Sequence, residues 1–120
     1  MIKIYEWQMQ KQIFEWAKLS ETKYPELKLL HASMNGVKMT NSLTGKRAKE
    51  TGLLCGIPDI HLPIANKKYI SLWIELKIKG NKPTKIQEQI ISLLNAYGNY
   101  AIVCYSFDEA VSAIKLYLEK

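Results

Sequence analysis

The sequence lacks any long hydrophobic run, and none of its apolar stretches approaches the roughly 20 residues of a transmembrane helix. It also opens without the charged segment, apolar segment and cleavage site that mark a secretory signal. Cysteine is scarce: Cys55 and Cys104 lie far apart and form no CxxC motif. This argues against a zinc or redox site and favours two free thiols. We therefore expect a cytoplasmic protein that has no membrane partner.

Internal repeats, low-complexity tracts and linker-like segments are absent as well. The 120 residues, 48% of them hydrophobic, suffice for one core without disulfide or metal support. The sequence therefore predicts a single domain over residues 1–120.

Acidic residues are few relative to basic ones: 11 Asp and Glu stand against 17 Lys and Arg, which gives a net charge of +6. In so small a domain this excess favours a polyanionic partner, with nucleic acid as the first candidate. A basic surface without a specific partner is the alternative, so charge alone decides nothing.

The first predicted element is a helix over about residues 5–19. At 100° per residue, one side of this helix carries Trp7, Ile13, Phe14 and Ala17. Glu6 and Gln10 fall on that same side, where a buried charge is costly unless it is paired. A half-exposed Glu6 that is stabilised by the helix dipole would also explain this arrangement.

Residues 27–33 resemble a short strand, and residues 34–56 show no sustained period. This second segment is predicted to be a long, glycine-punctuated loop, and such loops are more often functional than not. Its cations are candidates for contacts with phosphates: Lys38, Lys46, Arg47 and Lys49. A mobile solvated loop is the alternative interpretation.

A β-hairpin is predicted next, with residues 56–64 in one arm and residues 69–80 in the other. The second arm alternates between an apolar face and a face that carries Trp73, Glu75 and Lys77. In the first arm, Asp59 and His61 share a face. If the apolar faces of the two arms align, the faces of Asp59 and Glu75 align as well.

Two helices and a strand complete the chain. Thr84 and Gln87 form a capping box, Gly98 marks the end of that helix, and residues 99–106 form a strand before a helix capped by Ser106. The predicted core stripe of the first of these helices is Ile86, Ile90, Leu93, Leu94 and Tyr97. That of the last helix is Ala110, Val111, Ile114, Tyr117 and Leu118. The order α-β-β-β-α-β-α predicts an α/β fold, with a mixed sheet and helices on both sides.

The paired arms would bring the carboxylates of Asp59 and Glu75 together, with the Lys77 ammonium nearby. Like charges at such range repel, and a divalent cation such as Mg²⁺ or Mn²⁺ relieves this repulsion through hard oxygen ligands. The lysine could orient or help to deprotonate a water, or stabilise charge that develops on a phosphate.

GIPD, WIELK and KPTKIQ, in this order, resemble the VRR-NUC (virus-type replication-repair nuclease) domain of the PD-(D/E)XK nuclease superfamily. The resemblance extends to EWQMQKQIFEWA, to GKRAKETGLLCGIPD and to AIVCYSFDEA, and so covers nearly the whole chain. It implies a PD-(D/E)XK fold and a metal-dependent nuclease that acts on DNA.

The resemblance also assigns roles to residues. Asp59, Glu75 and the main-chain carbonyl of Leu76 would hold the metal, Glu6 would complete the acidic site, and Lys77 would be the catalytic lysine. Gln87 would match the glutamine that opens the following helix, and Gln10 would face the site and the DNA.

Small stand-alone relatives, bacterial or phage-encoded, are similar to dimeric Holliday junction resolvases. A structure-specific endonuclease on branched DNA, acting as a homodimer, is therefore expected. The alternatives are a flap- or end-directed nuclease and a DNA-binding module without catalysis.

Several side chains keep two interpretations. Gln87 could serve only as a cap or could combine capping with a role in the site. His31 and His61 could be structural, although His61 could also contact a phosphate. Trp73 could pack under a helix or stack on a base.

Overall fold

The computed structural model describes residues 4–33 and 42–119. The helices are α1 (Glu6–Leu19), the 3₁₀-helix η1 (Pro25–Leu29), α2 (Ser42–Glu50), α3 (Lys85–Ala96) and α4 (Phe107–Leu118). The strands are β1 (His31–Ala32), β2 (Ile60–Leu62), β3 (Leu72–Leu76) and β4 (Tyr100–Cys104). The predicted α/β order is confirmed, with η1 and α2 as additional elements.

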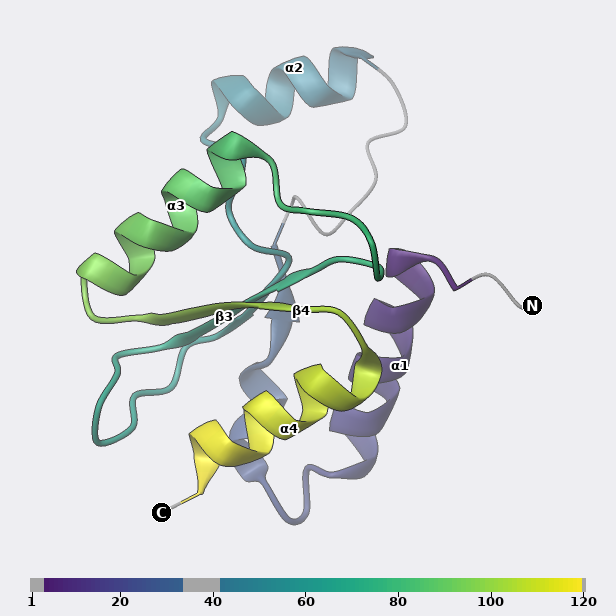
Figure 1. Cartoon of the computed structure of the whole chain (residues 1–120), viewed down its shortest axis with the longest axis vertical. Coiled ribbons are helices and arrows are strands. Elements are labelled where there is room, and N and C mark those ends of the chain that lie inside the picture. The colour runs from purple at the N-terminus through teal and green to yellow at the C-terminus, as the bar shows by residue number, and fades with distance from the viewer. Residues whose placement is uncertain (1–3, 34–41, 120) are drawn as a thin grey trace.

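The strands form one mixed sheet in the order β1-β2-β3-β4. Strand β2 pairs antiparallel with both β1 and β3, whereas β3 and β4 are parallel. Figure 1 shows α3 on one side of this sheet and α1 and α4 on the other, as the sequence predicts.

The core lies between the sheet and the pair α1 and α4. Alternate residues of β2 and β3 point into it, including Ile60, Leu62 and Ile74, which are fully buried. The five residues predicted as the core face of α4 are all buried, which confirms that assignment. In α1 the prediction holds for Ile13 and Ala17, whereas Trp7 is 63% exposed.

Helix α3 departs from the prediction. Its capping box and its glycine after the C-terminus are present, but it buries no residue completely. Ile86 and Leu93 are each 53% exposed and Tyr97 is 77% exposed, so the predicted core stripe was wrong for these three residues. Its other two members, Ile90 and Leu94, are half-buried. The side chain of Asn95 bonds both the N–H and the C=O of Ala101, which ties α3 to the sheet through polar groups. Periodicity identified the apolar residues correctly but could not show that only one edge of the stripe is covered.

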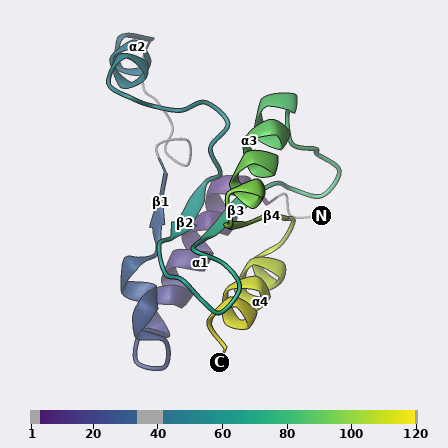
Figure 2. The same cartoon turned by 90° about the vertical axis from the view of Figure 1, so that its left-hand side faces the viewer.

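Two local predictions also need correction. Of the predicted strand at 27–33, His31 and Ala32 form β1, and Pro25 in the first turn of the preceding 3₁₀-helix favours that helix. The predicted loop at 34–56 contains α2, whose residues lack a clear apolar period. Figure 2 shows α2 standing away from the sheet, so no core-facing stripe is required of it.

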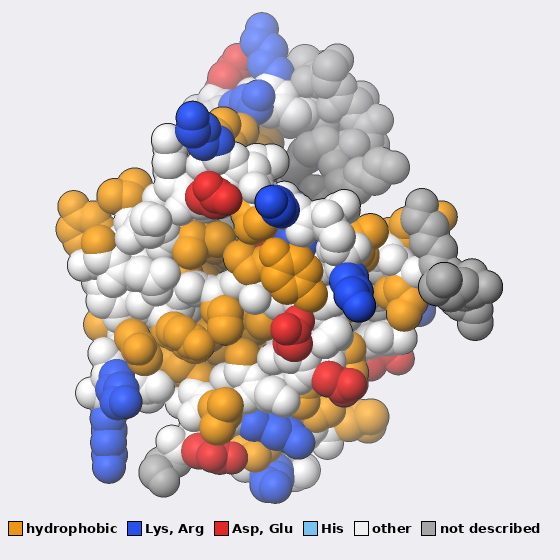
Figure 3. Space-filling model, in the orientation of Figure 1, with side chains coloured by type: hydrophobic (Ala, Val, Ile, Leu, Met, Phe, Trp, Pro, Cys, Tyr) orange, Lys and Arg blue, Asp and Glu red, His pale blue; other side chains and the backbone are white. Residues whose placement is uncertain are grey.

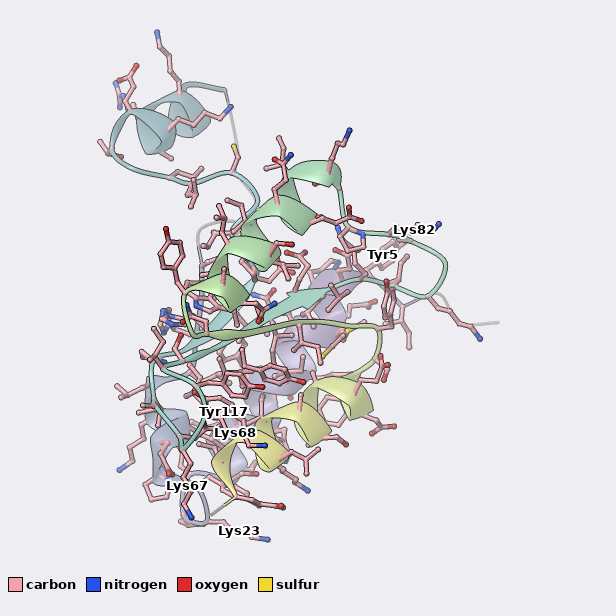
Figure 4. All side chains as sticks on the ribbon, turned by 60° about the vertical axis from the view of Figure 1, so that its left-hand side comes forward. Tyr5, Lys23, Lys67, Lys68, Lys82 and Tyr117 are labelled. Carbon is pink, nitrogen blue, oxygen red and sulfur yellow. The ribbon has the colours of Figure 1, made fainter. Side chains whose placement is uncertain are left out.

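The end of the sheet opposite Glu75 is closed by Tyr117 of α4. Its hydroxyl donates to the carbonyl of Ile64 at 2.7 Å, and Asn66 Nδ2 donates to the Tyr117 carbonyl at 3.0 Å. Figure 4 shows Tyr117 near Lys68 at this end. Within the described residues, no helix is both long enough and apolar enough to cross a membrane.

Candidate functional site

The register of β2 and β3 places the two predicted carboxylates together. Ile60 pairs with Ile74 and Leu62 pairs with Leu72, so the next positions along the two strands are Asp59 and Glu75. Both side chains lie on the face opposite the core, because neighbouring residues in a strand alternate. The predicted alignment of the hairpin faces is therefore confirmed.

Asp59 is held by the backbone of the neighbouring strand. Its Oδ2 accepts a hydrogen bond of 2.8 Å from the N–H of Leu76. Since the N–H and C=O of one strand residue point to the same edge, the Leu76 carbonyl also faces the Asp59 side of β3. Burial raises the pKa of Asp59, against the lowering effects of the Leu76 N–H, a hydrogen bond with Glu75 and the charge of Lys77.

Glu75 is the most perturbed acid in the site, with only 1% of its surface exposed. Its pKa is raised to about 9, first by burial and then by the charge of Asp59 and a hydrogen bond with that carboxyl group. Lys77 opposes this shift, and its Nζ lies 3.8 Å from Glu75 Oε2. The other oxygen, Oε1, is buried and receives no hydrogen bond from an N–H or hydroxyl group of the described residues.

Gln87 combines the two roles that the sequence left open. Its Oε1 accepts from the N–H of Thr84 at 2.8 Å, while its Nε2 lies 3.3 Å from Glu75 Oε2 and donates to it. The cap of α3 therefore also aims an amide into the site. Gly56 lets the chain pass close to this first turn of α3, because a Cβ atom at position 56 would lie 2.6 Å from Ile86 Cγ2. The φ of Gly56, +86°, also favours glycine.

Glu6 lies at the margin of this group. It is half-buried in the first turn of α1, and its charge is the smallest of the influences that raise the pKa of Glu75. No three His, Cys, Asp or Glu side chains of the described residues come together as a ready metal cluster. The role of Glu6 as a third ligand stays a prediction, as does the contact of half-buried Gln10 with DNA.

The basic residues predicted to bind DNA divide into two groups. Lys46, Arg47 and Lys49 are exposed on α2, away from the body of the sheet (Figures 1 and 2). Lys38 lies outside the described residues. Figure 3 shows lysine and arginine side chains at the upper end of the molecule, where α2 lies, and fewer near the middle of the sheet.

Three rings lie on the same sheet face as the carboxylates. His31 pairs with His61 across β1 and β2, and His61 pairs with Trp73 across β2 and β3. The His61 and Trp73 rings stack with centroids 3.7 Å apart. Burial, with a smaller effect of His31, lowers the pKa of His61 to about 4. The sequence analysis considered each residue singly. The period-2 alternation of both hairpin arms could have revealed the pairing of His61 with Trp73, but not the position of His31 beside them.

The donor set fits a divalent cation. Two carboxyl groups with raised pKa values, an orphaned carboxylate oxygen and a carbonyl on the same strand edge are hard oxygen ligands of the kind that Mg²⁺ and Mn²⁺ prefer. A cation would favour the ionised forms of both acids, because its positive charge would offset their mutual repulsion.

Comparison with known proteins gives a consistent picture at the level of structure. No family model matches the chain, and no curated protein matches it. A solved structure described as "VRR_NUC domain protein" superimposes with a TM-score of 0.81 over 98% of this chain and 91% of its own. The two sequences are 28% identical over this alignment. This likeness extends to nearly every element described above.

Proposed function

Because the chain is a VRR-NUC domain, we propose that it is a metal-dependent endonuclease that hydrolyses phosphodiester bonds in DNA. The substrate we propose is branched DNA, cut according to its structure and not according to its sequence. A domain of 120 residues has little surface left for reading base edges once the site is built.

The observation that carries this proposal is an acidic pair in a basic protein, formed by buried Glu75 and half-buried Asp59. A domain that only binds DNA has no reason to bring Asp59 and Glu75 together, since they would repel the phosphates that its net charge of +6 attracts. Two acids with raised pKa values beside a lysine suit a nuclease that holds a cation between protein and phosphate.

Asp59, Glu75 and the Leu76 carbonyl would hold Mg²⁺ or Mn²⁺. When bound, the cation would supply Lewis acidity toward a phosphate and acidify a water. Lys77 would orient the attacking water or offset charge on the phosphate, from its position beside Glu75 Oε2. Gln87 would fix the rotamer of Glu75 through its amide, and Glu6 would add negative charge at the margin.

We further propose that the active form on branched DNA is a homodimer. A two-fold branched substrate presents equivalent scissile phosphates, and a two-fold dimer presents equivalent sites. The exposed apolar stripe of α3, defined as Ile86, Ile90, Leu93 and Tyr97, supports this, because such stripes on a monomer mark interaction surfaces.

The decisive experiment measures cleavage of labelled four-way junctions, flaps, linear duplex and single strands with Mg²⁺, Mn²⁺ or a chelator. We expect wild type to cut the junction only with a metal ion. Glu75→Ala should lower the rate by at least about a hundredfold, in line with losing a catalytic electrostatic group. Glu15→Ala, which removes an exposed carboxylate from α1, should cut like wild type.

Other outcomes would revise the proposal in defined ways. Cleavage of flaps or ends, but not junctions, would keep the nuclease and discard the resolvase-like preference. Cleavage by Glu75→Ala at the wild-type rate would remove the assignment of this site. Tight binding without cleavage in any metal would favour the DNA-binding module, which shares the basic surface but leaves the acidic pair unexplained.

A further inference from the structure

The row of rings formed by His31, His61 and Trp73, here called the ring ladder, has no role in the chemistry proposed above. Its rings come from three adjacent strands at paired positions. His61 and Trp73 stack with an interplanar angle of 13°, and His31 meets His61 edge to face at 5.2 Å. His31 is exposed and the other two rings are half-buried, so the ladder reaches the surface.

The ladder shares the sheet face of the catalytic pair. His61 lies two residues beyond Asp59 in the chain, and Trp73 lies two residues before Glu75. Two strand residues span about 7 Å, so the ladder is within reach of the nucleotide next to a phosphate at Asp59 and Glu75.

Hydrogen bonds within the protein determine which ring nitrogens of the two histidines remain available to a ligand, and whether these nitrogens donate or accept. Ser71 donates its proton to Asn99 Oδ1, so its oxygen accepts from His61 Nε2, which lies 3.2 Å away. His31 Nδ1 lies 2.9 Å from the Leu29 carbonyl, which only accepts, so this nitrogen carries the proton. The remaining nitrogens, Nδ1 of His61 and Nε2 of His31, are acceptors when the rings are neutral.

This combination fits a nucleobase better than a phosphate. Phosphate oxygens are acceptors and would meet two further acceptors, whereas the amino groups of bases donate hydrogen bonds. The aromatic surface matches the flat faces of bases, which stack on tryptophan and histidine side chains in single-strand recognition. Bases inside a duplex already stack on their neighbours, so only a base whose stacking is interrupted is free to use such a surface.

We propose that the ring ladder binds an unstacked nucleobase next to the scissile phosphate. This inference rests on the proposed nuclease function and deepens it, since it defines the substrate class: DNA in which stacking is interrupted next to the cut, as at a branch point or a flap. The ladder thus selects a branch or flap over continuous duplex through a base contact that does not depend on base identity.

The test compares binding of intact and abasic DNA in the presence of a chelator, so that no cleavage intervenes. After the cut is mapped with Mg²⁺, one nucleotide at a time on either side of it is replaced by an abasic residue. For wild type we expect one flanking position at which loss of the base weakens binding about tenfold, the scale of one base–aromatic stack. An abasic residue five nucleotides away should leave binding unchanged.

Two variants assign this effect to the ladder. Trp73→Ala and His31→Ala should each reduce the tenfold preference for the intact base, and His31, being exposed, can be replaced without disturbing the core. Trp7→Ala removes an exposed ring from α1, on the other side of the sheet, and should keep the full preference. Thermal unfolding of each variant checks that the fold is retained.

The outcomes separate the two proposals. If wild type cuts DNA but shows no base preference at any flanking position, or if both ladder variants keep it, the ladder assignment is overturned and the nuclease stands. If wild type neither binds nor cuts any DNA, the proposed function falls, and this inference falls with it.

Discussion

At the scale of single residues, the ionisation of Glu75 dominates the site. In the metal-free protein it holds its proton to about pH 9, whereas a glutamate in the unfolded chain ionises near 4.5. Between these values the unfolded chain binds fewer protons than the folded one, so the free energy of unfolding falls as pH rises. Burial of this acid therefore costs stability at neutral pH, a cost that a functional site can impose on its fold.

The substitution Glu75→Gln should remove this pH dependence, because glutamine does not ionise. We expect the free energy of unfolding of Glu75→Gln to exceed that of wild type by a margin that grows by more than about 1 kcal/mol from pH 5 to pH 8. Urea unfolding in a chelator at a series of pH values measures it. Adding Mg²⁺ should stabilise wild type at pH 8 more than the variant; identical pH slopes for the two proteins would contradict the account.

At the scale of elements, α2 and α3 show how far the sequence could predict this fold. The capping residues Thr84 and Ser106 placed the starts of α3 and α4 correctly, because capping is a local interaction between neighbours in the chain. The hairpin register followed from matching two alternating faces. Which side of α3 faces the sheet depends on contacts with distant residues, and no local pattern contains that information.

The same distinction applies to the site. Asp59, Glu75 and Lys77 could be predicted together because two paired strands align them through a simple periodicity. To predict that Gln87 contacts both Thr84 and Glu75, one must know the distance from α3 to β3, which the sequence does not give. The ring ladder was missed as a unit because its third member, His31, lies on β1, and the pairing of β1 with β2 is a contact between segments far apart in the sequence.

Gln87 links the stability of α3 to the geometry of the site, and two substitutions separate these roles. Gln87→Glu keeps an oxygen for the Thr84 N–H but loses the donor to Glu75 and adds a third negative charge. We expect cleavage to fall at least about tenfold, while the free energy of unfolding with Mg²⁺ changes little. Thr84→Ala should instead cost about 1 kcal/mol through the lost cap and reduce cleavage far less.

Urea unfolding and single-turnover cleavage, measured side by side on both variants, test this separation. If Gln87→Glu cuts at the wild-type rate, the amide contact with Glu75 has no catalytic consequence, and Gln87 is a cap alone.

Another prediction concerns helix α2, whose cationic side chains lie away from the acidic pair. Neutralising Lys46, Arg47 and Lys49 to glutamine should weaken DNA binding and reduce the slope of log K against log salt by roughly 2 to 3, because each lost phosphate contact removes about 0.9. The control removes the same charge from the opposite end of the molecule, where Figure 4 labels Lys23, Lys67 and Lys68. Equal slopes for the two triple variants would show that α2 contributes only to the net charge.

At the scale of the whole molecule, the apolar stripe of α3 exposes hydrophobic surface that the domain does not bury by itself. Three of its four residues are more than half exposed: Ile86, Leu93 and Tyr97. With Ile90, the four residues of the stripe recur at intervals of four, three and four, so they form one side of the helix. Figure 3 shows hydrophobic side chains continuing at the surface over β4, the edge strand of the sheet. A second copy of the chain offers the same stripe, as a two-fold interface requires.

We therefore expect wild type to be a dimer in solution and Leu93→Lys to be a monomer, because the lysine would place two like charges in the centre of a two-fold contact. Leu116→Lys is the matched control, since Leu116 is an even more exposed leucine, at 70%, on α4. Light scattering coupled to size exclusion gives the masses. Separating the copies should also uncouple the two cuts on one junction, while each domain retains its metal-dependent chemistry. A monomeric wild type, or a dimeric Leu93→Lys, would show that this stripe is not the dimer contact.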